Sequence, residues 1–191
     1  MKTSPAKSKT TIAIACSFSS IAVFSGYMAL GSVPALIFTF GYLGGFFIWL
    51  FSFSRVPLRN IILPYSITLC FFIVHKIEER QMGFFPALAK LTGVATPDIS
   101  SWQAIALYAI ALIWLLIPLL IWKKHPLGYY LAWTFFTSMG VTELAHFIFP
   151  FFTSKSYSYF PGMWSVILLA PAAWWGMYRL EKQDSESIDQ H

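Results

Sequence analysis

Charged side chains are scarce in this sequence of 191 residues. Only 11% of the residues are Asp, Glu, Lys or Arg, whereas 57% are hydrophobic, including 19 phenylalanines and 8 tryptophans. A soluble domain of this size usually carries about a quarter charged residues. A water-soluble core could not bury so much apolar surface, so the composition excludes an ordinary soluble domain and predicts that the excess faces lipid.

Cysteine is also rare. Cys16 and Cys70 both fall inside apolar runs, which predicts small buried side chains rather than a disulfide or a metal-binding pair. The apolar stretch before Cys16 is short and apolar sequence continues directly after it, which argues against a lipoprotein cleavage site or a cleaved signal peptide.

Long apolar runs are abundant. A membrane span needs roughly 20 apolar residues at a rise of about 1.5 Å each. Six stretches are candidates, the first five with 20 to 23 residues and the last with 15: 11–30, 34–53, 60–80, 102–122, 127–149 and 164–178. The sequence therefore predicts an all-α fold, a polytopic membrane helix bundle of about six transmembrane helices in a lipid bilayer.

Basic residues between the spans predict the orientation. The net charge of +5 does not indicate a nucleic acid partner, because the basic residues are scattered between apolar runs. With the N-terminus inside, the inner segments hold nine of them: Lys2, Lys7, Lys9, Arg55, Arg59, Lys123, Lys124, Arg179 and Lys182. The outer segments hold four: Lys76, Arg80, Lys90 and Lys155. This asymmetry predicts that both termini are cytoplasmic.

Two segments are too polar to span. The connection 81–101 contains apolar residues interrupted by glycine and proline, which predicts a short interfacial helix on the outer surface, or a lid over something beneath it. The segment 181–191 is polar and predicts a disordered cytoplasmic tail.

Acids and histidines coincide inside the predicted spans. His75, Glu78 and Glu79 lie on the third span, and Glu143 and His146 lie on the fifth. Positions i, i+3 and i+4 share one face of an α-helix, so each span is predicted to carry one polar patch. The rise per residue places His75 about 22 Å and Glu143 about 24 Å from the inner ends of their spans. Because buried ionisable groups need partners, we expect the two patches to face each other.

Two imidazoles and three carboxylates suit a hard or borderline divalent metal, with zinc or iron favoured. Glu-x-x-His is also the unit that di-iron bundles use, although those sites draw on four acids. A metal-bound water would supply a nucleophile near neutral pH, and a spare glutamate could act as general base. We therefore predict His75, Glu78, Glu79, Glu143 and His146 as metal ligands and Glu78, Glu79 and Arg80 as catalytic residues, Arg80 as a holder of a substrate carboxylate or phosphate.

Several motifs of the chain resemble those of a known family. His75-x-x-Glu78-Glu79, followed by Phe85-Pro86, Glu143-x-x-His146 and Pro161-Gly162, is similar to the signature of the HXXEE-motif membrane proteins. That family is bacterial and archaeal, multi-spanning and of undefined function, and its motifs have been suggested to bind metal. It more often has Asn where this chain has Glu143.

The resemblance covers roughly residues 60–180. It implies three parts: an N-terminal tail with two accessory transmembrane helices (1–58), a four-helix HXXEE-like domain (59–180) and the tail (181–191). It also implies a multi-pass protein of the bacterial inner membrane. The predicted His/Glu ligands, rather than the resemblance, favour a metal-dependent membrane enzyme, a hydrolase or an oxidoreductase, acting on a lipid-like or apolar substrate. The sequence does not identify the oligomeric state.

Other interpretations stay open. The third-span patch could be a solvated helix end neutralised by Lys76 and Arg80, and Glu143 with His146 could be a hydrogen-bonded pair that only joins helices. A small transporter or proton relay could use the same carboxylates, and a non-catalytic scaffold would need the cluster only for structure. Glutamate intramembrane proteases place an arginine four residues after their second glutamate, whereas Arg80 follows Glu79 directly.

Overall fold

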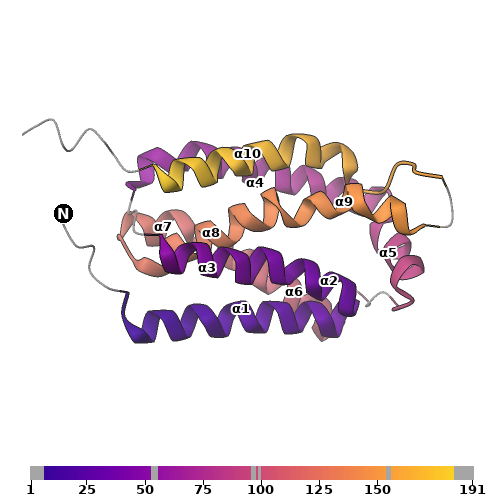
Figure 1. Cartoon of the computed structure of the whole chain (residues 1–191), viewed down its shortest axis with the longest axis horizontal. Helices are drawn as coiled ribbons and strands as arrows, with labels where there is room; N and C mark the ends of the chain where they lie inside the picture. Colours follow the sequence, from indigo (N-terminus) through magenta and orange to yellow (C-terminus); the bar gives the residue numbers. More distant parts are fainter. Residues whose placement is uncertain (1–6, 53–55, 96–97, 99, 154–155, 183–191) are drawn as a thin grey trace, which may run out of the picture.

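The fold was analysed in a computed structural model that describes residues 7–52, 56–95, 98, 100–153 and 156–182. Within these ranges the chain is helical and contains no strand. The helices run roughly parallel to one long axis and form a single bundle (Figure 1). The predicted fold class, an all-α helix bundle, is confirmed.

Five helical segments of the described chain are long and apolar enough to cross a membrane. They are Lys9–Leu30, Ser32–Phe51, Leu58–Gln81, Trp102–Trp122 and Pro126–Phe152, and they match the first five predicted spans. Large apolar side chains cover their outer faces; Phe24 is 61% exposed, Leu63 57% and Leu112 62%. Such a surface is expected of a bundle that is surrounded by lipid.

The sixth predicted span is helix α10 (Met163–Glu181), which is not among the five. Its tryptophans, Pro171 and Arg179 lower its hydropathy. It nevertheless lies along α4 (Leu58–Gln81) and α8 (Pro126–Gly140), two helices that belong to the candidate spans (Figure 1). Its crossing of the membrane stays a prediction.

Three of the five spans are irregular helices. The first, α1 (Lys9–Leu30), is continuous, whereas the second contains a π-helical turn, η1 (Thr39–Leu43), between α2 (Ser32–Phe38) and α3 (Gly44–Phe51). The fourth has a 3₁₀ turn, η2 (Trp114–Leu116), between α6 (Trp102–Ile113) and α7 (Ile117–Trp122).

The fifth span continues beyond α8 through η3 (Thr142–Leu144), α9 (Ala145–Ile148) and η4 (Phe149–Phe152).

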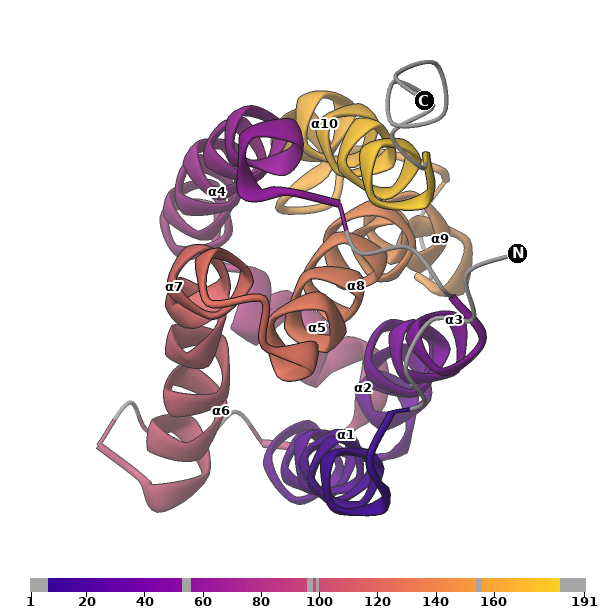
Figure 2. The same ribbon diagram turned by 90° about the vertical axis from the view of Figure 1, so that its left-hand side faces the viewer.

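Helix α8 is the centre of the bundle. Every residue of its stretch 128–140 is buried, and α1, α3, α4, α7 and α10 all pack on it. Figure 2 shows α8 inside a ring of the other helices. A glycine on the second span makes one of these contacts close: a Cβ on Gly45 would lie 2.7 Å from the Cα of Thr134.

Pro64 also ties the third span to α10. A proline inside a helix leaves the carbonyl four residues earlier without its usual donor, and here that carbonyl belongs to Asn60. Arg179 of α10 donates its Nε–H to it at 3.0 Å. The contact joins the start of α4 to the end of α10, two helices that pack along each other.

The connection 81–101 contains the predicted short helix, α5 (Phe84–Thr92). It lies across one end of the bundle, opposite the end where α1 begins and α10 finishes (Figure 1). Its Leu88 packs with Leu30, Ala145, Phe149 and Phe160. The start of α1 and the end of α10 thus share one end of the bundle; the side of the membrane to which that end belongs stays a prediction, as does the three-part division of the chain.

The prediction that both cysteines are buried is wrong. Cys16 and Cys70 are exposed on the outer faces of α1 and α4 and are unpaired. Both cysteines lie in continuous apolar runs, which lack the periodicity that would reveal which side of a span faces lipid, and this explains the error. The predicted disordered tail, 181–191, falls almost wholly on residues 183–191, which lie outside the described residues.

Candidate metal centre

Four of the predicted ligands converge between α4 and the turn after α8. His75, Glu79, Glu143 and His146 each offer one ligand atom, and these atoms all lie within 4.8 Å of one another. The prediction that the two polar patches face each other is therefore confirmed. This buried group of side chains, called the His/Glu cluster below, could hold a metal ion.

Local structure explains the convergence. α4 is an uninterrupted helix, so His75 and Glu79, at i and i+4, lie one turn apart on the same face. α8 ends at Gly140, and the following residue has φ −123° and ψ −51°, outside the helical region. The 3₁₀ turn that comes next directs Glu143 inward, with His146 one turn further along.

The distances in the cluster match those between ligands of one small ion. His75 Nε2 lies 3.3 Å from both Glu79 Oε1 and Glu143 Oε2. His146 Nε2 lies 3.4 Å from the same Glu79 oxygen and 3.2 Å from the same Glu143 oxygen. A tetrahedral ion with bonds of about 2.0 Å separates its ligands by about 3.3 Å.

Hydrogen bonds on the far side of each imidazole fix its orientation. His146 Nδ1 lies 2.5 Å from the Pro161 carbonyl oxygen, which can only accept, so this nitrogen carries the proton. His75 Nδ1 lies 2.8 Å from the Ser165 hydroxyl, which itself donates to the Gly162 carbonyl. The hydroxyl proton is thus committed, and His75 Nδ1 is the donor. When both imidazoles are neutral, each turns an Nε2 lone pair toward the carboxylates.

This arrangement needs a positive species at its centre. In it, two nitrogen lone pairs face two carboxylate oxygens, and all four are acceptors. Among the described residues, His75 Nε2 is a buried atom with no hydrogen-bond partner. An ion, or protons on the imidazoles, would turn the repulsion into attraction. Imidazole ligands that donate their other N–H to a carbonyl or hydroxyl are the usual arrangement in metal sites, so the residues fit a divalent ion.

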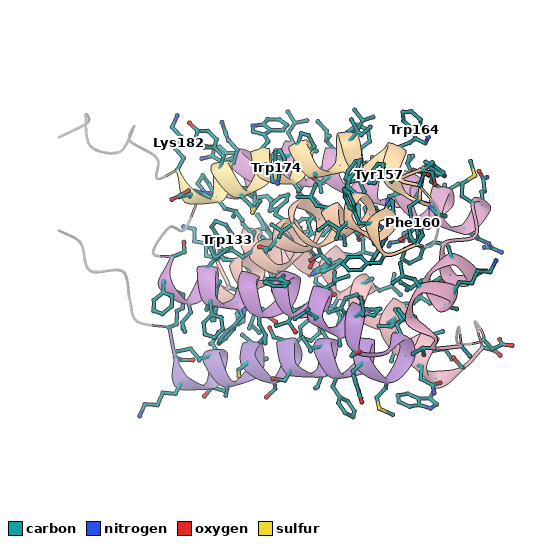
Figure 3. All side chains as sticks on the ribbon, turned by 45° about the vertical axis from the view of Figure 1, so that its right-hand side comes forward. Trp133, Tyr157, Phe160, Trp164, Trp174 and Lys182 are labelled. Carbon is teal, nitrogen blue, oxygen red and sulfur yellow. The ribbon has the colours of Figure 1, made fainter. Side chains whose placement is uncertain are left out.

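The surroundings exclude water from the His146 side. The centroid of the Phe84 ring, at the start of α5, lies 4.9 Å from the centroid of the His146 ring. The ring centroids of Phe149 and Phe160 lie 5.9 and 6.3 Å from it. Figure 3 places Phe160 at the α5 end of the bundle, far from Lys182 at the other end. Phe84, Phe149 and Phe160 thus form an apolar cover over His146, while Phe151 and Phe152 point outward and are each 71% exposed.

Gly162 lets the two imidazoles approach each other. Its φ is +98°, a conformation that favours glycine. A Cβ there would lie 2.5 Å from His146 Cε1 and 2.9 Å from His75 Cε1, too close for either ring to keep its place.

We expect Gly162→Ala to weaken metal affinity by about ten- to a hundredfold, the range for disturbed supporting groups, because the rings must move. Competition with a chromogenic chelator measures this. Gly93→Ala is the matched control: it has φ +71° and no atom within 4 Å of its Cβ position, so it carries the backbone strain alone. Equal losses in both variants would contradict this role of Gly162.

Glu78 lies outside the cluster, contrary to its predicted place among the ligands. Its carboxylate accepts from the Tyr159 hydroxyl at 2.6 Å and from the backbone N–H groups of Trp164 and Ser165 at 3.2 and 2.8 Å. It therefore caps the N-terminus of α10, whose own N-cap residue is a glycine with no side chain. Burial and this contact raise the pKa of Tyr159 to about 12, so its phenol stays a donor.

Helix geometry explains why Glu78 lies outside the cluster. Neighbouring residues on a helix point about 100° apart, so when Glu79 faces His75, Glu78 faces α10. Arg80 is exposed and also lies outside the group of four.

We expect Glu78→Ala to destabilise the fold by about 1–2 kcal/mol, as for a lost helix cap, while the protein keeps its metal. Thermal unfolding in detergent and metal analysis of the same sample check both parts. Glu78→Gln, which retains an acceptor oxygen, should lose less stability. If Glu78→Ala lost its metal with unaltered stability, Glu78 would return to the ligand set.

Lys76 also contacts the cluster, although the sequence pattern suggested it only as a cation that neutralises a solvated helix end. Its Nζ lies 2.7 Å from Glu79 Oε2 and 3.6 Å from Glu143 Oε1, the oxygens that do not face the imidazoles. The i,i+3 spacing from Glu79 could have indicated it. The Pro161 carbonyl and the Ser165 hydroxyl carry no comparable signal in the sequence.

The comparisons with known proteins were made against family models, curated sequences and solved structures. None of them matches this chain. The resemblance to the HXXEE-motif membrane proteins therefore rests on the motifs alone, and the His/Glu cluster is interpreted from its own geometry.

Proposed function

We propose that this chain is a metal-dependent integral membrane enzyme that acts on a lipid-like or apolar substrate. One observation supports the proposal above all: two imidazole nitrogens and two carboxylate oxygens surround one point in a bundle whose outer faces are apolar. A nitrogen and oxygen ligand set of this kind favours zinc or iron. A substrate that reaches the site through such a surface would itself be soluble in the membrane.

The residues of the site would have different roles. His75, His146, Glu79 and Glu143 would hold the ion, which when bound would act as a Lewis acid and lower the pKa of a bound water. Ser165 and the Pro161 carbonyl hold the imidazoles in the ligating tautomer. Glu78 already accepts three hydrogen bonds, so it leaves no spare glutamate in the site. A general base would have to be the second, non-ligating carboxylate oxygen of Glu143, whose side chain is 13% exposed.

Membership of the HXXEE family and the membrane topology belong to the same proposal. In this proposal the chain crosses a bacterial inner membrane six times, with both termini in the cytoplasm. The nine-to-four distribution of basic residues supports it, as does the common end at which α1 begins and α10 finishes. Alkaline phosphatase fused after α10 should be inactive in this topology, and an active fusion would contradict it.

The enzymatic part is tested with purified protein in liposomes made from total bacterial lipid. Lipid composition is followed by mass spectrometry with metal-loaded protein, with metal-depleted protein and with the Glu79→Gln variant. A lipid consumed only by the loaded, unaltered chain supports the proposal. Identical lipid profiles in the three samples would contradict an action on membrane lipids.

Lys76 favours one alternative, a structural cluster without metal. Its ion pairs with Glu79 and Glu143, together with one protonated histidine, would balance both carboxylates. A chain with such a metal-free cluster would be a scaffold rather than an enzyme. Protein purified without chelators would then contain no stoichiometric metal. Metal analysis therefore separates the two functions before any substrate is known.

A further inference from the structure

The charge of the occupied cluster suggests what else it binds. Glu79 and Glu143 bring two negative charges, and Lys76 brings one positive charge within ion-pair distance of both. Imidazoles that ligate a metal are neutral, and a divalent ion adds two positive charges. The sum is one positive charge in a largely buried site, where uncompensated charge is costly. This step depends on the proposed metal.

The cluster is open on one side only, where Lys76 lies. The side chains of His75, His146 and Glu79 are at most 5% exposed, whereas that of Lys76 is 41% exposed. Phe84, Phe149 and Phe160 cover His146, and Ser165 and Gly162 cover His75. A ligand from outside would meet the ammonium group of Lys76 and then the partly exposed Glu143.

The surface around Lys76 is apolar. The Phe72 ring centroid lies 5.4 Å from Nζ, and Ile73 and Ile77, close to Lys76 on α4, are 53% and 50% exposed. Arg80, one helical turn further along α4, is also exposed. A cation inside an apolar surface matches a molecule with a negatively charged group and a hydrocarbon part.

We propose that the metal-loaded cluster binds an anionic oxygen ligand, a phosphate or carboxylate group, with Lys76 as the side chain that recognises its charge. The group completes the charge balance that the ion leaves open, and Lys76 donates hydrogen bonds to it from the exposed side. A lipid head group and a free anion share this chemistry. The apolar surroundings favour the lipid.

The test uses protein loaded with Co²⁺, whose visible spectrum responds to a change of ligand. The probes are dioctanoyl phosphatidic acid, inorganic phosphate and, as an uncharged control, dioctanoylglycerol. We expect the two phosphates to change the spectrum with a measurable Kd and dioctanoylglycerol to leave it unaltered. Tighter binding of phosphatidic acid than of phosphate would identify the lipid as the source, and the reverse would identify the free anion.

Substitutions show whether Lys76 recognises the charge. Lys76→Met should weaken phosphate binding by about tenfold or more, the usual effect of a lost charge-assisted hydrogen bond, and Lys76→Arg should retain it. Lys90→Met removes the same charge from the exposed face of α5 and should change nothing. Equal affinity in Lys76→Met and the unaltered chain, or no binding of either phosphate, overturns the inference. Co²⁺ content is measured in every sample, so failure of the metal site itself would be seen separately.

Discussion

Replacing Glu79 with Gln is expected to lower metal affinity by at least about a hundredfold. The carboxylate supplies one of four ligand atoms and half of the negative charge that holds the ion. Even groups that only support a ligand change affinity by about ten- to a hundredfold, so loss of a ligand should do more. Metal content after dialysis against a weak chelator, measured by plasma mass spectrometry, gives the result directly.

The adjacent residue provides a control of the same chemistry. Glu78→Gln makes an identical change one position earlier, on the side chain that caps α10, and should leave one metal per chain. Metal retained in both variants would show that Glu79 is no ligand, whereas parallel losses would show that the two glutamates are not distinguished in the way the structure indicates. Because sequence analysis treated the two glutamates alike, this pair also tests what the structure adds.

Metal removal is expected to lower the melting temperature by about 10 °C. An ion present at a thousandfold excess over its Kd stabilises the folded state by about 4 kcal/mol. For a chain of this size, 1 kcal/mol corresponds to about 2–4 °C. Thermal unfolding in detergent, before and after chelation and after metal is restored, measures the shift.

The Glu79→Gln variant separates this effect from others caused by the chelator. Its melting temperature should be insensitive to chelation, because it holds little metal at the outset. An equal fall in both proteins would assign the effect to the chelator or to a metal elsewhere. An unaltered melting temperature in the native chain would favour the structural cluster that Lys76 completes.

Much of the site followed from helix geometry. The i,i+4 spacing of His75 and Glu79 and the i,i+3 spacing of Glu143 and His146 are fixed by the helical repeat. Their similar depth followed from the rise per residue. Both arguments need only correct span positions, and the apolar runs supplied these to within a few residues.

The remaining features depend on contacts that no local pattern encodes. Glu78 was assigned to the wrong partner because the N-terminus of α10, which it caps, lies 86 residues away along the chain. The Ser165 hydroxyl that orients His75 is 90 residues away. Similarly, the break after Gly140 interrupts an apolar run that reads as one helix. Such details depend on which helices become neighbours.

X-ray absorption spectroscopy of the protein purified without chelators tests the central claim most directly. One bound zinc or iron per chain, surrounded by two imidazole nitrogens and at least two oxygens at about 2.0–2.2 Å, is the expected result, and it should disappear in Glu79→Gln. A protein without stoichiometric metal, or a bound metal whose spectrum shows no imidazole, would contradict a metal centre built from His75, Glu79, Glu143 and His146.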